Sequence, residues 1–173
     1  MQLLLAAKAN PDGTKRQRPI IQAASAGCAP CVQALLATGA HPNLTDDALQ
    51  TALVAVVVNE KFSPEALKLL LAAGADPNTA NGAGTTPLQG HVAQRMEYVP
   101  RRRREVSTAA AAELDAEFMQ AACLLLARGA KADIPDGEGK TCLDVLRINS
   151  SLTVFRSLLV ELGQPIPGPA DGW

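Results

Sequence analysis

The chain has 173 residues, of which 47% are hydrophobic and only 3% aromatic, and its formal net charge is −1. A chain of this length can bury a substantial core, and with so few aromatic residues that core must consist of closely packed Ala, Leu and Val, which favours helices. The near-neutral charge gives no general attraction to nucleic acid or to an anionic membrane, so neither is an expected partner.

The first segment, "MQLLLAAKANPDG", has no basic region and too short an apolar stretch for a signal peptide, and no run of about 18 apolar residues follows. The four cysteines are not spaced like a small disulfide framework, which favours a reducing compartment. The sequence therefore predicts a soluble cytoplasmic protein, with the nucleus as the alternative location.

One phrase recurs along the chain. It occurs as "LLLAAKANPD" (3–12), "LLATGAHPN" (35–43), "LLLAAGADPN" (69–78) and "LLLARGAKAD" (124–133). The anchors Asn10, Asn43, Asn78 and Asp133 are 33, 35 and 55 residues apart, and a second phrase is centred nine residues after each, at Pro19, Ala52, Pro87 and Cys142. Self-similarity at a fixed period indicates stacked repeats.

Each repeat predicts two helices and a turn. Thr51, Thr86 and Thr141 can cap the start of a first helix, and Pro19 and Pro87 suit a first helical turn. A second, leucine-rich helix ends at Gly39, Gly74 or Gly129, each expected in the left-handed conformation. Between repeats, Gly- and Asn-rich segments such as "NTANGAGT" (78–85) predict turns or hairpins, here called fingers.

The two recurring phrases, seen as "GTTPLQ" at the first helix and "LLLAAGADPN" at the second, resemble the signature motifs of the ankyrin repeat. The resemblance implies an all-α repeat solenoid of about four ankyrin repeats plus a partial N-terminal one. The histidine of the family's first-helix motif is absent from every copy, so the sequence predicts that some hydrogen bonds between fingers are missing. Its place is taken by Ile21, Val54, Gln89 and Asp144.

The resemblance covers residues 1–163, which we interpret as one array. The expected units are a partial repeat at 1–10 and repeats at about 11–43, 44–78, 79–133 and 134–163, the third carrying an insertion near 97–117. Residues 164–173 are a Pro- and Gly-rich tail or the start of a further repeat.

The resemblance implies a function without catalysis, cofactor or metal: binding of a protein or peptide on the concave face formed by the fingers and first helices. The finger charges run from basic in the first finger to acidic in the second, and a partner should present the opposite order. The expected contact residues are Lys15, Arg16, Arg18, Asp46, Asp47, Asn81 and Glu138.

The insertion suggests an alternative function. Ser107 or Thr108 can cap an early start of the second helix, and the first helix is expected to lengthen to about Tyr98. Arg101, Arg102, Arg103 and Arg104 would then tip a helical arm on the side of the solenoid away from the fingers. The cluster is either a solvated turn or a site for an acidic partner, nucleic acid or the nuclear-import machinery.

Other chemical motifs have simpler explanations. "CAPC" (28–31) has the spacing of a thiol–disulfide motif, but the repeat register places Cys31 on an apolar helix position and Pro30 at a helix start. Cys123 and Cys142 are expected to be small structural residues. Neither His41 nor His91 has partners spaced as in a triad, and "GEGKT" (137–141) lacks the first glycine of a phosphate-binding loop.

The N-terminal leucines, Leu3, Leu4 and Leu5, have no preceding helix to cover them. Because terminal repeats need polar caps, we expect that the natural chain continues beyond one or both ends, or that this end self-associates weakly with another copy.

Overall fold

The computed structural model describes residues 10–59, 62–94, 108–144, 159–160 and 163, with only the backbone for 108–115. The predictions for Leu3, Leu4 and Leu5, for Tyr98 and for Arg101 to Arg104 therefore lie outside the described residues, as do those for the tail at 164–173.

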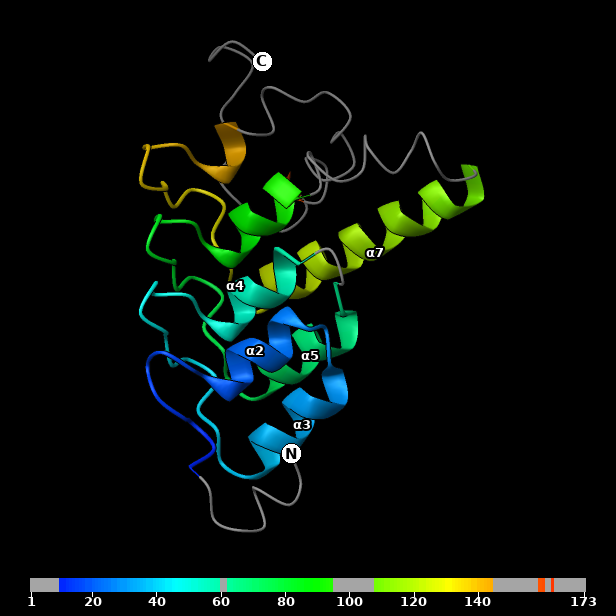
Figure 1. Cartoon of the computed structure of the whole chain (residues 1–173). Coiled ribbons are helices and arrows are strands. Elements are labelled where there is room, and N and C mark those ends of the chain that lie inside the picture. The colour runs from blue at the N-terminus through cyan, green and yellow to red at the C-terminus, as the bar shows by residue number, and fades with distance from the viewer. Residues whose placement is uncertain (1–9, 60–61, 95–107, 145–158, 161–162, 164–173) are drawn as a thin grey trace.

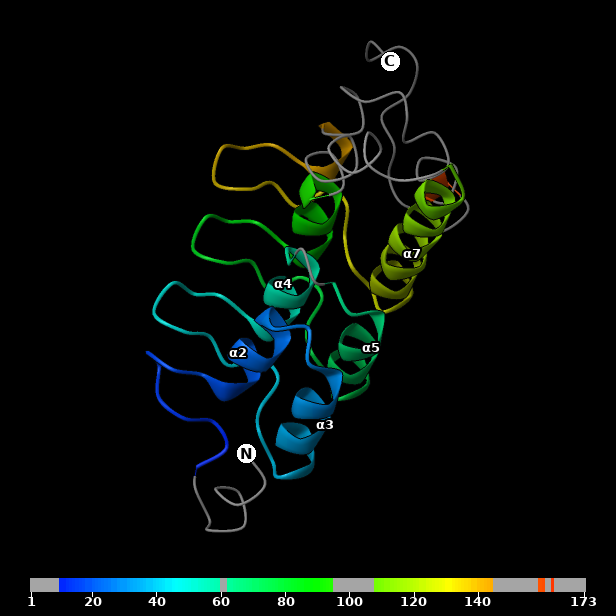
Figure 2. The same cartoon turned by 45° about the vertical axis from the view of Figure 1, so that its right-hand side comes forward.

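The described residues form a solenoid of helix pairs, as predicted. The inner helices are α2 (Pro19–Ser25), α4 (Ala52–Val57) and a helix over 87–94, and the outer helices are α3 (Ala29–Ala37), α5 (Pro64–Ala72) and α7 (Thr108–Ala127). Figure 2 shows the inner and outer helices as two layers, with the fingers along one side. Neighbouring helix pairs pack on one another: α2 packs on α3 and α4, and α5 packs on α3, α4 and α7.

The core consists of Ala, Leu and Val, as the composition predicts. All six residues of α4 are buried, none more than 2% exposed. Beside it, Gly90 approaches closely enough that a Cβ there would lie 2.8 Å from Val58 Cγ1. The inner helices therefore pack at a distance that only small residues allow.

The helix ends follow the sequence signals. Thr51 Oγ1 accepts a hydrogen bond from Val54 N at 3.2 Å. Thr86 and Gln89 form a reciprocal capping box, in which Thr86 N donates to Gln89 Oε1 at 2.8 Å and Gln89 N donates to Thr86 Oγ1 at 3.4 Å. The second helices end at glycines with φ between +85° and +92°, as predicted: Gly39, Gly74 and Gly129.

Neighbouring repeats are joined by an asparagine ladder, formed by Asn43 and Asn78. Asn43 accepts from Asp76 N at 2.8 Å through Oδ1 and donates to Gly74 O at 2.9 Å through Nδ2. Asn78 repeats this pattern one unit further, accepting from Lys131 N at 2.9 Å and donating to Gly129 O at 2.8 Å. Each amide thus satisfies backbone groups just after the outer helix of the following repeat.

In the first repeat the ladder position is held by Asp12, which corrects the assignment of Asn10 as the anchor. Asp12 Oδ1 accepts from His41 N at 2.8 Å, whereas the side chain of Asn10 bonds to Gly13 O and Asp12 N within its own turn. Counted from Asp12, the first finger is two residues shorter than the second. The other carboxylate oxygen, which cannot donate as an amide does, lies 3.0 Å from His41 Nδ1.

The pKa of the Asp12 carboxyl is lowered, chiefly by the hydrogen bond from the backbone N–H of His41 and against the opposing effect of burial. The carboxylate side chain is 21% exposed, so solvent screens these interactions only in part.

The prediction of missing hydrogen bonds between fingers is wrong at Gln89. Its Nε2 donates to Ile134 O at 2.8 Å and to Lys140 O at 3.0 Å, so it joins the inner helix over 87–94 to the fourth finger. An amide can replace the histidine because it also presents an N–H donor at the end of a short side chain. At Ile21 and Val54 the buried side chains are apolar and provide no such bond.

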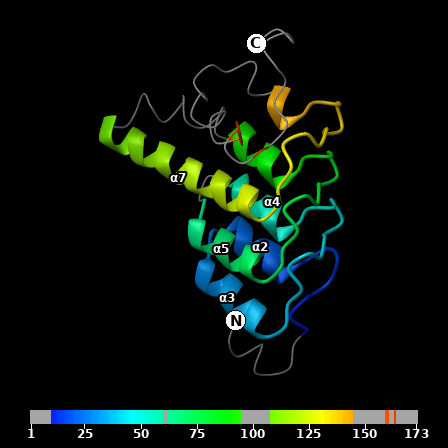
Figure 3. The same ribbon diagram turned by 180° about the vertical axis from the view of Figure 1, so that it is seen from behind.

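The early start of the third outer helix is confirmed. Helix α7 begins at Thr108, and Figures 1 and 3 show its N-terminal turns extending beyond the other outer helices on the side away from the fingers. Its C-terminal half packs into the solenoid on one face, formed by Phe118, Ala121, Ala122, Leu125 and Leu126.

We predict that Asn43→Ala lowers the free energy of unfolding by about 1 to 2 kcal/mol, because it removes two hydrogen bonds that join repeats. Asn10→Ala is the matched control, since it removes two bonds that lie within one exposed turn. Urea unfolding followed by circular dichroism measures both. Equal losses for the two variants would contradict a special role for the ladder.

We also predict that Asp12→Asn reduces the loss of stability in acid. Because the folded-state pKa of Asp12 lies below its unfolded value of 3.8, the carboxylate stabilises the fold above that pH, and this contribution disappears as the pH falls through the folded-state pKa. The Asp12 carboxyl titrates between about pH 5 and pH 3. Over this range the urea midpoint should fall less in Asp12→Asn than in the parent. Asp47→Asn, at an exposed finger position, should follow the parent. Parallel curves for Asp12→Asn and the parent would refute the prediction.

Candidate binding surface of the fingers

The second, third and fourth fingers share one turn, built by a side-chain oxygen. Asp46, Asn81 and Asp136 each accept hydrogen bonds through Oδ1 from the backbone N–H groups two and four residues later, all between 2.9 and 3.0 Å. Two of the predicted contact residues, Asp46 and Asn81, therefore have one oxygen committed to shaping the finger.

The fingers also bond to one another through their backbones. Gly82 N donates to Ala48 O at 3.1 Å, and Gly137 N donates to Ala83 O at 3.0 Å. A Cβ at Gly82 or Gly137 would lie 2.8 or 2.7 Å from the same carbonyl oxygens, so the close approach requires glycine. The second, third and fourth fingers thus form a continuous stack rather than independent loops.

The charges of the first and second fingers face one another. Arg16 Nε lies 4.0 Å from Asp47 Oδ2, with 91% and 58% of the two side chains exposed. Arg18 is half-buried and donates to Thr45 O and to Asp12 O, both at 3.1 Å. The opposite signs predicted for these fingers are therefore partly paired within the protein, and Arg18 serves to join them.

The remaining finger residues are at the surface. Lys15 is exposed and forms no ion pair with any described residue. Glu138 accepts a hydrogen bond from Lys140 Nζ at 2.8 Å, and this bond raises the pKa of Lys140. The "GEGKT" segment belongs to the fourth finger turn, in which Asp136 N bonds to Lys140 O at 2.8 Å, and not to a phosphate-binding loop.

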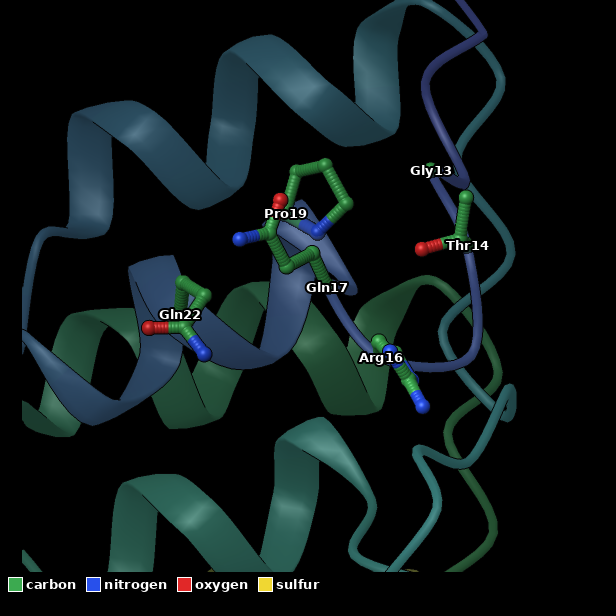
Figure 4. Close-up of a pocket in the computed structure, with 6 residues that line it drawn as sticks. All are labelled: Gly13, Thr14, Arg16, Gln17, Pro19 and Gln22. Carbon is green, nitrogen blue, oxygen red and sulfur yellow. The ribbon is translucent and has the colours of Figure 1, made fainter.

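A hollow of about 560 Å³ opens between the first finger and the start of α2 (Figure 4). Figure 4 shows Gln17 and Pro19 between the finger on one side and Gln22 of α2 on the other. Among the described residues, Arg16 is the only charged one that lines it, and no carboxylate does. The lining consists of Gly13, Thr14, Arg16, Gln17, Pro19 and Gln22. The sequence does not predict this hollow, because Thr14, Gln17 and Gln22 are not part of the repeated motifs.

The prediction of structural, reduced cysteines needs correction at one place. Cys28 and Cys31 are joined by a disulfide across the first turn of α3. As predicted, Pro30 lies in the first turn of α3 and Cys31 packs against the core. Cys123 and Cys142 are free, and burial raises the pKa of the Cys142 thiol to about 12.

The two histidines have different structural settings. His91 is buried, with its ring stacked on Phe118 at a centroid distance of 4.6 Å, 5.4 Å from the Phe62 ring, and its Nε2 3.1 Å from Phe118 O. His91 therefore serves to pack its helix against α7. His41 is exposed at the base of the second finger, as predicted.

Among the described residues, no cluster of three or more His, Cys, Asp or Glu side chains could hold a metal ion, and no helix is long and apolar enough to span a membrane.

The family model for ankyrin repeats (3 copies) matches residues 1–81. A search of curated proteins found no match. The same features continue beyond residue 81: Asn78 bonds to Lys131 N and Gly129 O, Asp136 forms the same finger turn, and Gly129 ends α7 with a positive φ. Ankyrin repeats are generally protein–protein interaction modules and are typically non-catalytic. The chain is an ankyrin-repeat protein.

Proposed function

We propose that the protein is a non-catalytic interaction module that binds a polypeptide partner on the face formed by its fingers and inner helices. The observation that carries this proposal is the hollow between the first finger and α2. It opens at the first finger, which the Arg18 side chain joins to the second, and backbone hydrogen bonds join the second, third and fourth fingers. A partner could therefore contact the hollow and the neighbouring finger tips together.

The lining of the hollow indicates the chemistry of the partner. Arg16 supplies a cation that is 91% exposed, and Thr14, Gln17 and Gln22 supply exposed donors and acceptors. Lys15 adds a second exposed cation on the same finger. A partner segment with an acidic side chain flanked by polar residues fits this lining, because a guanidinium forms bidentate hydrogen bonds with carboxylates.

The surface is also suited to binding because it is already ordered. The asparagine ladder fixes the spacing of repeats, and backbone hydrogen bonds join the second, third and fourth fingers. Binding to a preformed surface avoids the entropic cost of ordering loops. This proposal uses no residue of the arginine-rich insertion, which lies outside the described part of the chain.

We predict that Arg16→Glu slows association with the partner by about three- to tenfold at low salt, because charges at the edge of an interface mainly set the association rate. Lys68→Glu on α5 is a matched control. Like Arg16, Lys68 is an exposed cation whose ammonium lies 4.0 Å from one carboxylate, that of Glu65, but it lies on an outer helix.

The measurement has two steps. Affinity capture with the parent chain and mass spectrometry identify a partner, and surface plasmon resonance then compares the parent, Arg16→Glu and Lys68→Glu at two salt concentrations. Equal association rates for the two variants would exclude the first finger as the binding site. Both variants should unfold at the parent's urea midpoint, since exposed ion pairs contribute little to stability.

A further inference from the structure

The disulfide between Cys28 and Cys31 lies in a part of the fold that partner binding does not use. It joins the N-cap residue of α3 to the third residue of that helix, directly after the turn between α2 and α3, which lies on the side of the solenoid opposite the fingers (Figure 1). Both cysteines are half-buried, and their Cα atoms are 5.2 Å apart.

This disulfide is poorly placed to act as a structural staple. It joins residues only three positions apart, and the stabilisation gained from restricting an unfolded chain grows with the length of the closed loop. The turn is already fixed by its backbone. Gly27 N donates to Ala24 O, Cys28 N donates to Ala23 O, and Val32 N donates to Cys28 O, each at 3.0 Å. The bond therefore adds little to a turn that is complete without it.

The two sulfur atoms have different surroundings. Cys28 is the N-cap residue of α3, and no side chain caps that helix start. Because Pro30 has no N–H, the amide within reach of a Cys28 thiolate is that of Cys31, the third residue of the helix. The helix N-terminus stabilises a negative charge there. Cys31, in contrast, packs against the hydrophobic core.

We propose that Cys28 and Cys31 form a thiol–disulfide exchange site in which Cys28 is the reactive sulfur and Cys31 the resolving one. Its reactants are thiols and disulfides, for which glutathione serves as the probe. A glutathione thiolate attacks Cys28 Sγ, the Cys28–Cys31 bond breaks, and its electron pair leaves on Cys31 Sγ, which takes a proton from water. A second glutathione thiolate attacks the glutathione sulfur of the mixed disulfide, releasing oxidised glutathione and the Cys28 thiolate.

The reverse sequence oxidises the protein, and single-cysteine variants make it measurable. In reduced Cys31→Ala, attack of Cys28 on oxidised glutathione stops at the mixed disulfide. In reduced Cys28→Ser, which keeps an N-cap oxygen, only Cys31 can react. Both variants carry Cys123→Ser to remove the half-buried free thiol, whereas Cys142 is buried and can stay.

Intact-mass spectrometry at pH 7 follows the gain of one glutathione. We expect Cys31→Ala to react about threefold or more faster than Cys28→Ser, since each unit by which a thiol pKa falls raises its thiolate fraction about tenfold while its nucleophilicity falls about threefold. A reference protein that carries only Cys123→Ser should instead lose two thiols together and retain no glutathione. In urea the difference between the variants should disappear, because the helix N-terminus is lost.

Equal rates in the folded variants would overturn the proposal, as would a rate difference that persists in urea or a reference protein that keeps both thiols in oxidised glutathione. Circular dichroism of both variants establishes that they are folded. The result does not depend on the proposed partner, so the two proposals can fail separately.

Discussion

The solenoid depends on one recurrent interaction, the hydrogen bonds that a side chain of one repeat makes with the backbone of the next. Asn43 and Asn78 each use the acceptor and the donor of one amide to satisfy two backbone groups beside a terminal glycine. An isolated helix pair has no such partner. Each repeat thus leaves backbone groups that only its neighbour can satisfy, and this fixes both the stacking distance and the place of the fingers.

The sequence predicted those parts of the fold that depend on local backbone chemistry. Thr51 at a helix start and Gly74 at a helix end act through groups within a few residues, so their identities are sufficient signals. The extension of α7 to Thr108 was predictable for the same reason, because its Ala-rich start has a high intrinsic helix propensity.

The features that sequence reasoning missed depend on contacts between distant residues. Asn10 and Asp12 are chemically similar, and only the bond from His41 N shows which of them occupies the ladder position. Gln89 takes the histidine's place because Ile134 O and Lys140 O, far along the chain, lie within its reach. The hollow beside α2 likewise arises from the shape of the first finger, and no single residue or motif in the sequence predicts that shape.

The complete burial of α4 has a consequence for how such a protein can diversify. Its six side chains fill the core, so a substitution there would disturb packing before it altered any contact with a partner. The tips of the fingers, in contrast, can accept many substitutions, because their turns need only an Asp or Asn and a few glycines. Residues such as Lys15 and Ala48 can therefore vary without cost to the scaffold, which makes the finger edge the part of this chain where new specificities can arise.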